Sequence, residues 1–165
     1  MRYYGFGNYY LSSLQQGLQA AHVIKGLWTE YEKDTQSYQI AEEYARNHKT
    51  MVLLNGGNAA GLRYIYNSFK KFEAEGMTLP FAKFNEDEQS LDGALTAVGI
   101  VLPEKYYLMM DVLRKKMSKG EKNKKKDKKN KKKNKLDVFE KLITKGWASW
   151  EVELMKMIMP MQLAK

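Results

Sequence analysis

The sequence has 165 residues, a length that suits one domain with a hydrophobic core of its own. It contains no cysteine, which excludes disulfides, thiolate metal sites and a cysteine nucleophile, and its two histidines are too few for a histidine-rich metal centre. The net charge of +9 is uneven, because residues 114–135 hold 14 of the 28 basic and 2 of the 19 acidic residues, which leaves +12 there and −3 elsewhere.

No apolar run approaches the roughly 18–20 residues that span a membrane. The first residues include Arg2, Asn8 and Ser12 and do not form the apolar core of a signal peptide. We therefore expect a soluble, cytoplasmic protein that has no membrane partner and needs no metal or other cofactor. If a phage encodes it, the host cytoplasm is the expected location.

The chain opens with a predicted strand in Arg2–Leu11, which is rich in tyrosine and glycine. A helix is predicted from Ser13 to about Lys33. Ser12 and Ser13 each precede a glutamine by three residues, which is the spacing of a capping box, so either serine can begin this helix. The free backbone amides at such a helix start favour an anion or another polar ligand.

Gln19 and His22 are three residues apart in this predicted helix and therefore point the same way. One interpretation is that they face a ligand, with His22 as a general base or a phosphate donor near neutral pH. The other is that they only satisfy a buried helix interface.

A second helix is predicted after Thr35, and residues 50–54 form a continuous apolar run, which is typical of a strand buried on both faces. That strand ends in Asn55-Gly56-Gly57, and a helix with apolar residues at helical spacing follows and stops at Gly76. In α/β sheets the carboxyl ends of strands are where ligands bind, so this turn is either a ligand-binding loop or an ordinary turn.

Residues 79–84 are predicted as a short strand, and an acidic loop at 85–93 separates it from a strand at 94–102. The loop is either a solvated turn or part of a site. Thr96 is the only hydroxyl in the second of these strands, with a functional or a purely local role. Strands that alternate with helices predict a sheet covered on both faces.

We therefore predict an α/β protein, a three-layer α/β/α sandwich with a four-stranded mixed sheet and a C-terminal helical extension. The expected domains are 1–117, a disordered lysine-rich insertion at 118–135, and a helical extension at 136–165. The insertion either attracts RNA or is a tolerated low-complexity segment. The extension carries Trp147, Trp150 and several methionines, and either covers the core of its own domain or forms a homodimer.

Residues 1–103 resemble the type II peptidyl-tRNA hydrolase superfamily, in particular its small divergent phage and bacterial members. The segment Leu18-Gln19-Ala20-Ala21-His22-Val23 is similar to the family's Ala-Ala-Gln-x-x-His-Ala signature in the spacing of Gln and His. Phe84-Asn85-Glu86-Asp87-Glu88 and Ala94-Leu95-Thr96-Ala97-Val98 look like the family's acidic loop and Leu-Thr-Ala strand. The family's lysine position holds Gln15 here, which favours an altered substrate.

The resemblance implies a hydrolase with a nucleic-acid or nucleotide substrate, such as tRNA, in which a carboxylate or His22 activates water. An alternative is a phage counter-defence protein that sequesters or cleaves a cyclic nucleotide messenger in the same pocket. A purely structural role is the third possibility. The candidate catalytic residues are His22, Glu86, Glu88 and Thr96, and the candidate ligand-binding residues are Ser12, Ser13, Gln16, Gln19, Asn55, Gly57 and Asp87.

Overall fold

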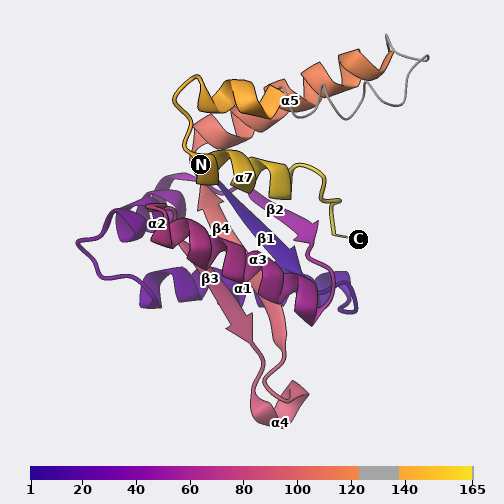
Figure 1. Ribbon diagram of the computed structural model, residues 1–165. Coiled ribbons are helices and arrows are strands. Elements are labelled where there is room, and N and C mark those ends of the chain that lie inside the picture. Colours follow the sequence, from indigo (N-terminus) through magenta and orange to yellow (C-terminus); the bar gives the residue numbers. More distant parts are fainter. Residues whose placement is uncertain (123–137, 165) are drawn as a thin grey trace. The chain divides into compact units, whose positions relative to one another are not determined.

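A computed structural model of the chain describes residues 1–122 and 138–164 (Figure 1). Contacts divide it into two units, Met1–Pro103 together with Met161–Lys165, and Glu104–Pro160. Most of the predicted lysine-rich insertion, residues 123–135, lies outside the described residues. Its first part, residues 118–122, belongs to a helix.

The first unit contains a four-stranded mixed sheet, as predicted, with the strand order β2-β1-β4-β3. Strand β1 is parallel to β2 and antiparallel to β4, and β3 is antiparallel to β4. The elements follow in the order β1 (Arg2–Gly7), α1 (Ser13–Thr29), α2 (Gln36–Asn47), β2 (Met51–Asn55), α3 (Ala59–Ala74), β3 (Phe81–Asn85), α4 (Glu88–Leu91) and β4 (Leu95–Leu102).

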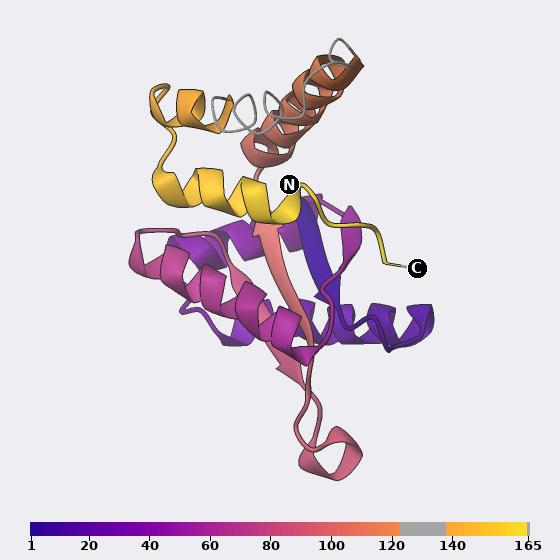
Figure 2. The ribbon, with the colours of Figure 1, turned by 45° about the vertical axis from the view of Figure 1, so that its right-hand side comes forward.

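Helices cover both faces of the sheet, which confirms the predicted three-layer sandwich. Helices α1 and α2 lie on one face and α3 on the other (Figure 2). The α3 face is aromatic, because Phe69 packs between Phe6 of β1 and Phe81 of β3, with ring centroids 5.9 and 5.5 Å away. Every residue of β4 is buried, since this central strand is covered on both sides.

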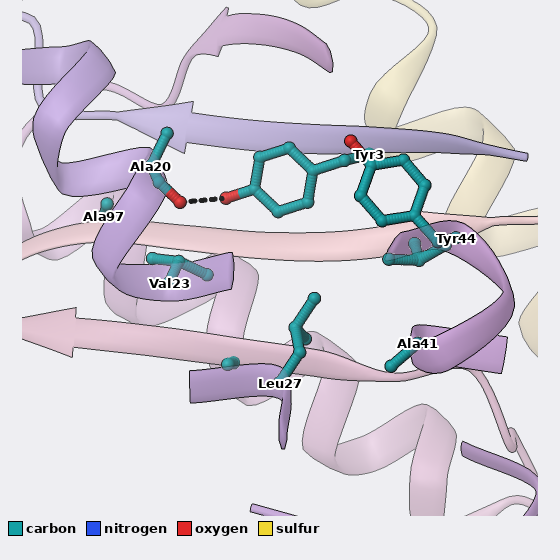
Figure 3. Close-up of a cluster of buried hydrophobic side chains, with 9 residues drawn as sticks. Tyr3, Ala20, Val23, Leu27, Ala41, Tyr44 and Ala97 are labelled. Carbon is teal, nitrogen blue, oxygen red and sulfur yellow. Dashed lines mark hydrogen bonds between the residues drawn. The ribbon is translucent and has the colours of Figure 1, made fainter. Parts of the chain in front are cut away.

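The other face of the sheet is built around Tyr3, which is fully buried under α1 and α2 (Figure 3). Its hydroxyl donates to the backbone oxygen of Ala20 in α1 at 3.4 Å, and its ring lies 6.3 Å from that of Tyr44 in α2. Gly99 of β4 leaves the space that this ring occupies, because a Cβ there would lie 2.6 Å from Cζ of Tyr3. A large aromatic ring thus fits between a strand and two helices only opposite a glycine.

Some boundaries and burial patterns of the predicted elements are wrong. Helix α1 ends at Thr29 rather than near Lys33. Strand β2 is not buried on both faces, because it lies at the edge of the sheet and only Leu54 of its five residues is buried. An apolar run looks the same in an edge strand as in a central one, and only the strand order separates the two cases.

The second unit is helical, which agrees with the predicted helical extension. Its described residues form α5 (Glu104–Lys122), a helix at residues 138–143 and α7 (Ser149–Ile158). Helix α5 extends to Lys122, five residues into the insertion that the sequence analysis predicts to be disordered. Among the described residues of both units, no helix is long and apolar enough to cross a membrane.

Glu151 organises the polar interior of the second unit. This carboxylate is only 7% exposed and accepts hydrogen bonds from Lys105 Nζ at 2.7 Å, Tyr106 Oη at 2.8 Å and the backbone N–H of Ala148 at 2.9 Å. Burial raises the pKa of Glu151, but the hydrogen bonds from Lys105, Ala148 and Tyr106 together outweigh it and hold the pKa below its ordinary value.

We expect this carboxylate to make the second unit sensitive to acid. Folding lowers the pKa of Glu151. Its carboxylate therefore contributes to stability at a pH above its ordinary pKa of 4.5, and this contribution is lost as the pH falls through the lower pKa of the folded protein. Glu151→Gln should lower the free energy of unfolding at pH 7 by about 1–3 kcal/mol and flatten its decline in acid. Urea unfolding followed by tryptophan fluorescence between pH 7 and pH 3 measures both effects. If the free energy of unfolding of Glu151→Gln declined as steeply between pH 7 and pH 3 as that of the unmodified protein, this role of Glu151 would be contradicted.

Candidate functional site

The candidate site lies at the end of the sheet where β1, β2 and β3 finish, and we call this end the site edge of the sheet. The strand directions bring the carboxyl ends of β1, β2 and β3 and the start of β4 to this edge, since Gly7 pairs with both Asn55 and Ala97, and Asn85 pairs with Leu95. The three segments that the sequence analysis singles out therefore begin at the same edge. They are the start of α1, the turn after β2 and the acidic loop after β3 (Figure 1).

Gln19, Glu86 and Thr96 meet at the site edge, although they come from three different elements. The side-chain Nε2 of Gln19 donates to Oε1 of Glu86 at 2.5 Å, and Oγ1 of Thr96 lies 3.5 Å from the same oxygen. Glu86 is half-buried. From the described residues, no hydrogen bond reaches its second oxygen, Oε2. The carboxylate is thus held through one oxygen and presents the other.

The side-chain oxygen of Gln19 is the second unusual atom of this cluster. Gln19 Oε1 is buried and accepts no hydrogen bond from any described residue. A buried acceptor without a donor costs about 1–3 kcal/mol. Because this oxygen is shielded from solvent, and Gln16 Oε1 is in the same state, the missing donor does not by itself indicate a bound ligand.

A β-bulge explains how Thr96 reaches the cluster. Phe84 pairs with Ala97 but Asn85 pairs with Leu95, so one step along β3 corresponds to two steps along β4 and Thr96 is the extra residue. A bulge changes the direction of a side chain relative to regular alternation. Thr96 Oγ1 also lies 3.5 Å from the backbone oxygen of Phe84, which keeps the hydroxyl at the start of the acidic loop.

His22 lies one turn further along α1 than Gln19. Its ring stacks on Phe84 with centroids 4.4 Å apart and planes 12° apart, and the residue is exposed. Phe84 directly precedes Asn85 and Glu86, so His22 lies near the cluster through this ring. No described residue hydrogen-bonds its imidazole. The stacking fixes the plane of the imidazole and leaves both nitrogens open to a ligand.

The start of α1 is ordered by its own side chains. Ser12 caps the helix, because its side chain accepts from the N–H of Gln15 while the Gln15 side chain accepts from the N–H of Ser12, as the capping box predicts. Ser13 is the first helical residue and is exposed. Both serines therefore lie on the accessible side of this helix end.

Gln16 occupies a different environment from the other predicted ligand-binding residues. It is 5% exposed, and its Nε2 donates to the backbone oxygen of Leu11 at 2.9 Å. Its Oε1 lies where a Cβ on Gly7 would approach within 2.8 Å, so this side chain packs directly on β1. The space around it has no room for a water molecule. In this conformation Gln16 positions α1 on the sheet rather than reaching a ligand.

The turn after β2 is fixed to the turn after β1. The Asn55 side chain accepts from the N–H of Gly57 at 2.9 Å, the oxygen of Gly57 accepts from the N–H of Tyr9 at 3.0 Å, and the N–H of Gly56 donates to Gly7 at 2.9 Å. Gly57 has φ 81°, a conformation that favours glycine. This turn supports the loop that leads into α1, and no hydrogen bond among the described residues joins it to Glu86.

Two neighbouring tyrosines on the loop between β1 and α1 are exposed. The sequence analysis placed both of them inside the first strand. Tyr9 and Tyr10 follow the end of β1, are 46% and 74% exposed, and have ring centroids 4.0 Å apart. Tyr3 and Tyr4, by contrast, are both buried. The predicted strand extended to Leu11, but β1 ends at Gly7, so the rings of Tyr9 and Tyr10 lie outside it.

Asp87 and Glu88 lie beyond Glu86 at the start of the short helix α4, and both are exposed. Neither side chain joins the Gln19–Glu86–Thr96 cluster. They add negative charge to the site edge of the sheet. Among the described residues, no group of three or more acidic or histidine side chains has the geometry to hold a metal ion.

Comparisons with known proteins do not place the chain in a family. The sequence matches no protein-family model, and no curated protein matches it.

Proposed function

We propose that this protein is a hydrolase that cleaves a carboxylic ester in a nucleic-acid or nucleotide substrate. The similarity of residues 1–103 to the peptidyl-tRNA hydrolases suggests this activity. The observation that carries the proposal is Glu86, whose Oε1 is held by Gln19 while Oε2 accepts no hydrogen bond from the described residues. A fixed carboxylate with one open oxygen is suited to remove a proton from water.

In the proposed reaction, a water molecule bound by Glu86 Oε2 attacks the ester carbonyl. Its proton passes to Glu86 as the new C–O bond forms, which produces a tetrahedral intermediate with a negative oxygen. The bond to the alcohol then breaks, and the departing oxygen takes the proton back from Glu86. The products are a carboxylic acid and the free hydroxyl of the nucleotide, and Glu86 ends in its starting state.

Gln19 and Thr96 are positioning residues in this scheme. The hydrogen bond from Gln19 Nε2 fixes the direction of the carboxylate. Thr96, the extra residue of the bulge, places its Oγ1 3.5 Å from the same carboxylate oxygen. A carboxylate held in one direction receives the water in a fixed orientation, which lowers the entropic cost of the attack.

Charge favours an ester over a phosphodiester as the bond that is cleaved. Glu86 is followed directly by Asp87 and Glu88, and its described hydrogen-bond partners, Gln19 and Thr96, are neutral. A carboxylate repels an anionic phosphodiester but does not repel a neutral ester carbonyl. The exposed rings of Tyr9 and Tyr10, at the site edge of the sheet, offer a surface on which bases can stack.

A binding screen followed by product analysis tests the proposal. Purified protein is mixed with peptidyl-tRNA, uncharged tRNA, and cyclic and linear nucleotides. Thermal unfolding then reports binding, since a ligand of the folded state raises the melting temperature. Mass spectrometry reports new products. We expect peptidyl-tRNA to be cleaved to peptide and tRNA. Stabilisation by a cyclic nucleotide, with no cleavage of any ester, would instead support messenger capture and overturn the hydrolase.

A further inference from the structure

The last described residues of the chain pair with the open edge of the sheet through a single antiparallel bridge. The backbone oxygen of Gln162 accepts from the N–H of Asn55, and the N–H of Ala164 donates to Leu53, both at 2.9 Å. Leu163 lies opposite Leu54 in an antiparallel bridge. Residues Gln162–Ala164, which we call the C-terminal strand, therefore cover the outer edge of β2 at Leu53–Asn55, where backbone groups would otherwise be unpaired.

The C-terminal strand is held weakly by its side chains. Leu163 is 67% exposed, so the strand depends on two backbone hydrogen bonds more than on burial. It also follows a separate unit, because residues 104–160 form their own group of contacts whereas residues 161–165 group with the sheet. The C-terminal strand is short, and residues 104–160 separate it in the chain from the sheet with which it pairs. Segments with this connectivity are the ones that exchange between identical chains.

We propose that the C-terminal strand exchanges between two copies of the chain, so that Gln162–Ala164 of one copy pairs with β2 of the other. The contacts made in the exchanged dimer are the same two hydrogen bonds and the same bridge that the single chain makes. The segment that pairs with β2 in the exchanged dimer is thus the one that already pairs with β2 in the single chain. Because the exchange is reciprocal, it closes as a two-fold dimer and leaves neither edge open.

This exchange links the dimer to the candidate site. The strand binds the N–H of Asn55, the same residue whose side chain accepts from Gly57 N–H, and the oxygen of Gly57 accepts from Tyr9. A continuous path of hydrogen bonds therefore joins the C-terminal strand of one copy to the loop before α1 of the other. Pairing of the strand supports the turn that adjoins this loop.

Engineered cysteines test the exchange directly, since the chain has none of its own. Leu54 and Leu163 face each other without hydrogen bonds between them, the arrangement in which side chains of opposed strands lie closest. Leu54→Cys and Leu163→Cys are made in separate chains, mixed at high concentration and oxidised. We expect a covalent species of about twice 19.2 kDa on a non-reducing gel, absent when either variant is oxidised alone.

A chain with both cysteines is the reference. If this double variant forms the disulfide within one chain while the mixture of single variants gives no covalent dimer, the C-terminal strand pairs only within its own chain and the proposal is overturned. If neither sample forms a disulfide, the strand does not pair with β2 at all, which also overturns it. Ala164→Pro removes the N–H that binds Leu53 and should abolish the dimer in light scattering, whereas Ala164→Ser keeps that N–H and should preserve it.

Discussion

Replacing Glu86 with glutamine should lower kcat/KM for the hydrolysed ester by about 10²–10⁴-fold, the usual contribution of a general base. Glutamine has the shape of glutamate, and its side-chain oxygen can still accept from Gln19 Nε2. It cannot take a proton from water, so the loss falls on the chemical step and kcat should fall more than KM rises. Steady-state kinetics on the cleaved substrate measures this change.

Two variants make the result specific. Glu32→Gln also removes one carboxylate, but Glu32 is an exposed residue between α1 and α2. The kcat/KM of this variant should stay within twofold of that of the unmodified protein. Glu88→Gln tests the other carboxylate that the sequence proposed as catalytic, which the structure leaves outside the cluster. If Glu86→Gln were fully active while Glu88→Gln was inactive, the base would be Glu88 and the proposed cluster would be wrong.

A large effect on stability is expected from Gly99→Ala. The new Cβ would lie 2.5 and 2.6 Å from Cε2 and Cζ of Tyr3, closer than real carbon contacts allow. The ring of Tyr3 is fully buried and its hydroxyl is bonded to α1, so it has little freedom to move aside. Overpacking of this kind costs about 1–3 kcal/mol. Urea unfolding measured by circular dichroism gives the change in free energy.

Gly17→Ala provides a matched control for the same chemical change. Gly17 lies inside α1, and a Cβ there would meet no atom within 4 Å. Because alanine is the better helix former, this variant should be more stable by about 0.5–1 kcal/mol. Combining Gly99→Ala with Tyr3→Phe removes the hydroxyl that the new methyl meets and should recover part of the loss. Equal stability of Gly99→Ala and the unmodified protein would contradict the described packing.

Local signals in the sequence predicted the elements well. The capping residues Ser12 and Thr35 begin α1 and α2 as their side chains indicate, and Gly76, with φ 97°, follows the end of α3. These signals act within a few residues of the backbone groups that they satisfy, so a single sequence carries them. The alternation of strands and helices was likewise enough to predict the sandwich and its mixed sheet.

The arrangement of the site depended on contacts that the sequence does not encode locally. Gln19 and Glu86 are 67 residues apart, and only the placement of α1 across β3 and β4 joins them. Thr96 was noticed as the single hydroxyl of an apolar strand, but the bulge that directs it was not predicted. Gln16 carries no signal that separates it from Gln19, yet one packs on Gly7 and the other reaches the acidic loop.

The C-terminal strand was missed for a related reason. Three residues are too few for a periodic pattern, and their pairing partner, β2, lies more than a hundred residues earlier in the chain. The wrong prediction that β2 is buried on both faces has a different cause, because only the strand order shows that β2 lies at the edge of the sheet. An edge strand and its covering strand are recognised only together.

Hydrolysis of peptidyl-tRNA in water enriched in ¹⁸O tests the central claim most directly. If Glu86 directs water onto an ester carbonyl, the released peptide should carry one solvent oxygen in its carboxylate, 2 Da heavier by mass spectrometry, and its formation should be slowed about 10²–10⁴-fold in Glu86→Gln. Release of the peptide at the rate of a sample without protein would contradict the account. Equal rates in the two proteins would contradict the role of Glu86.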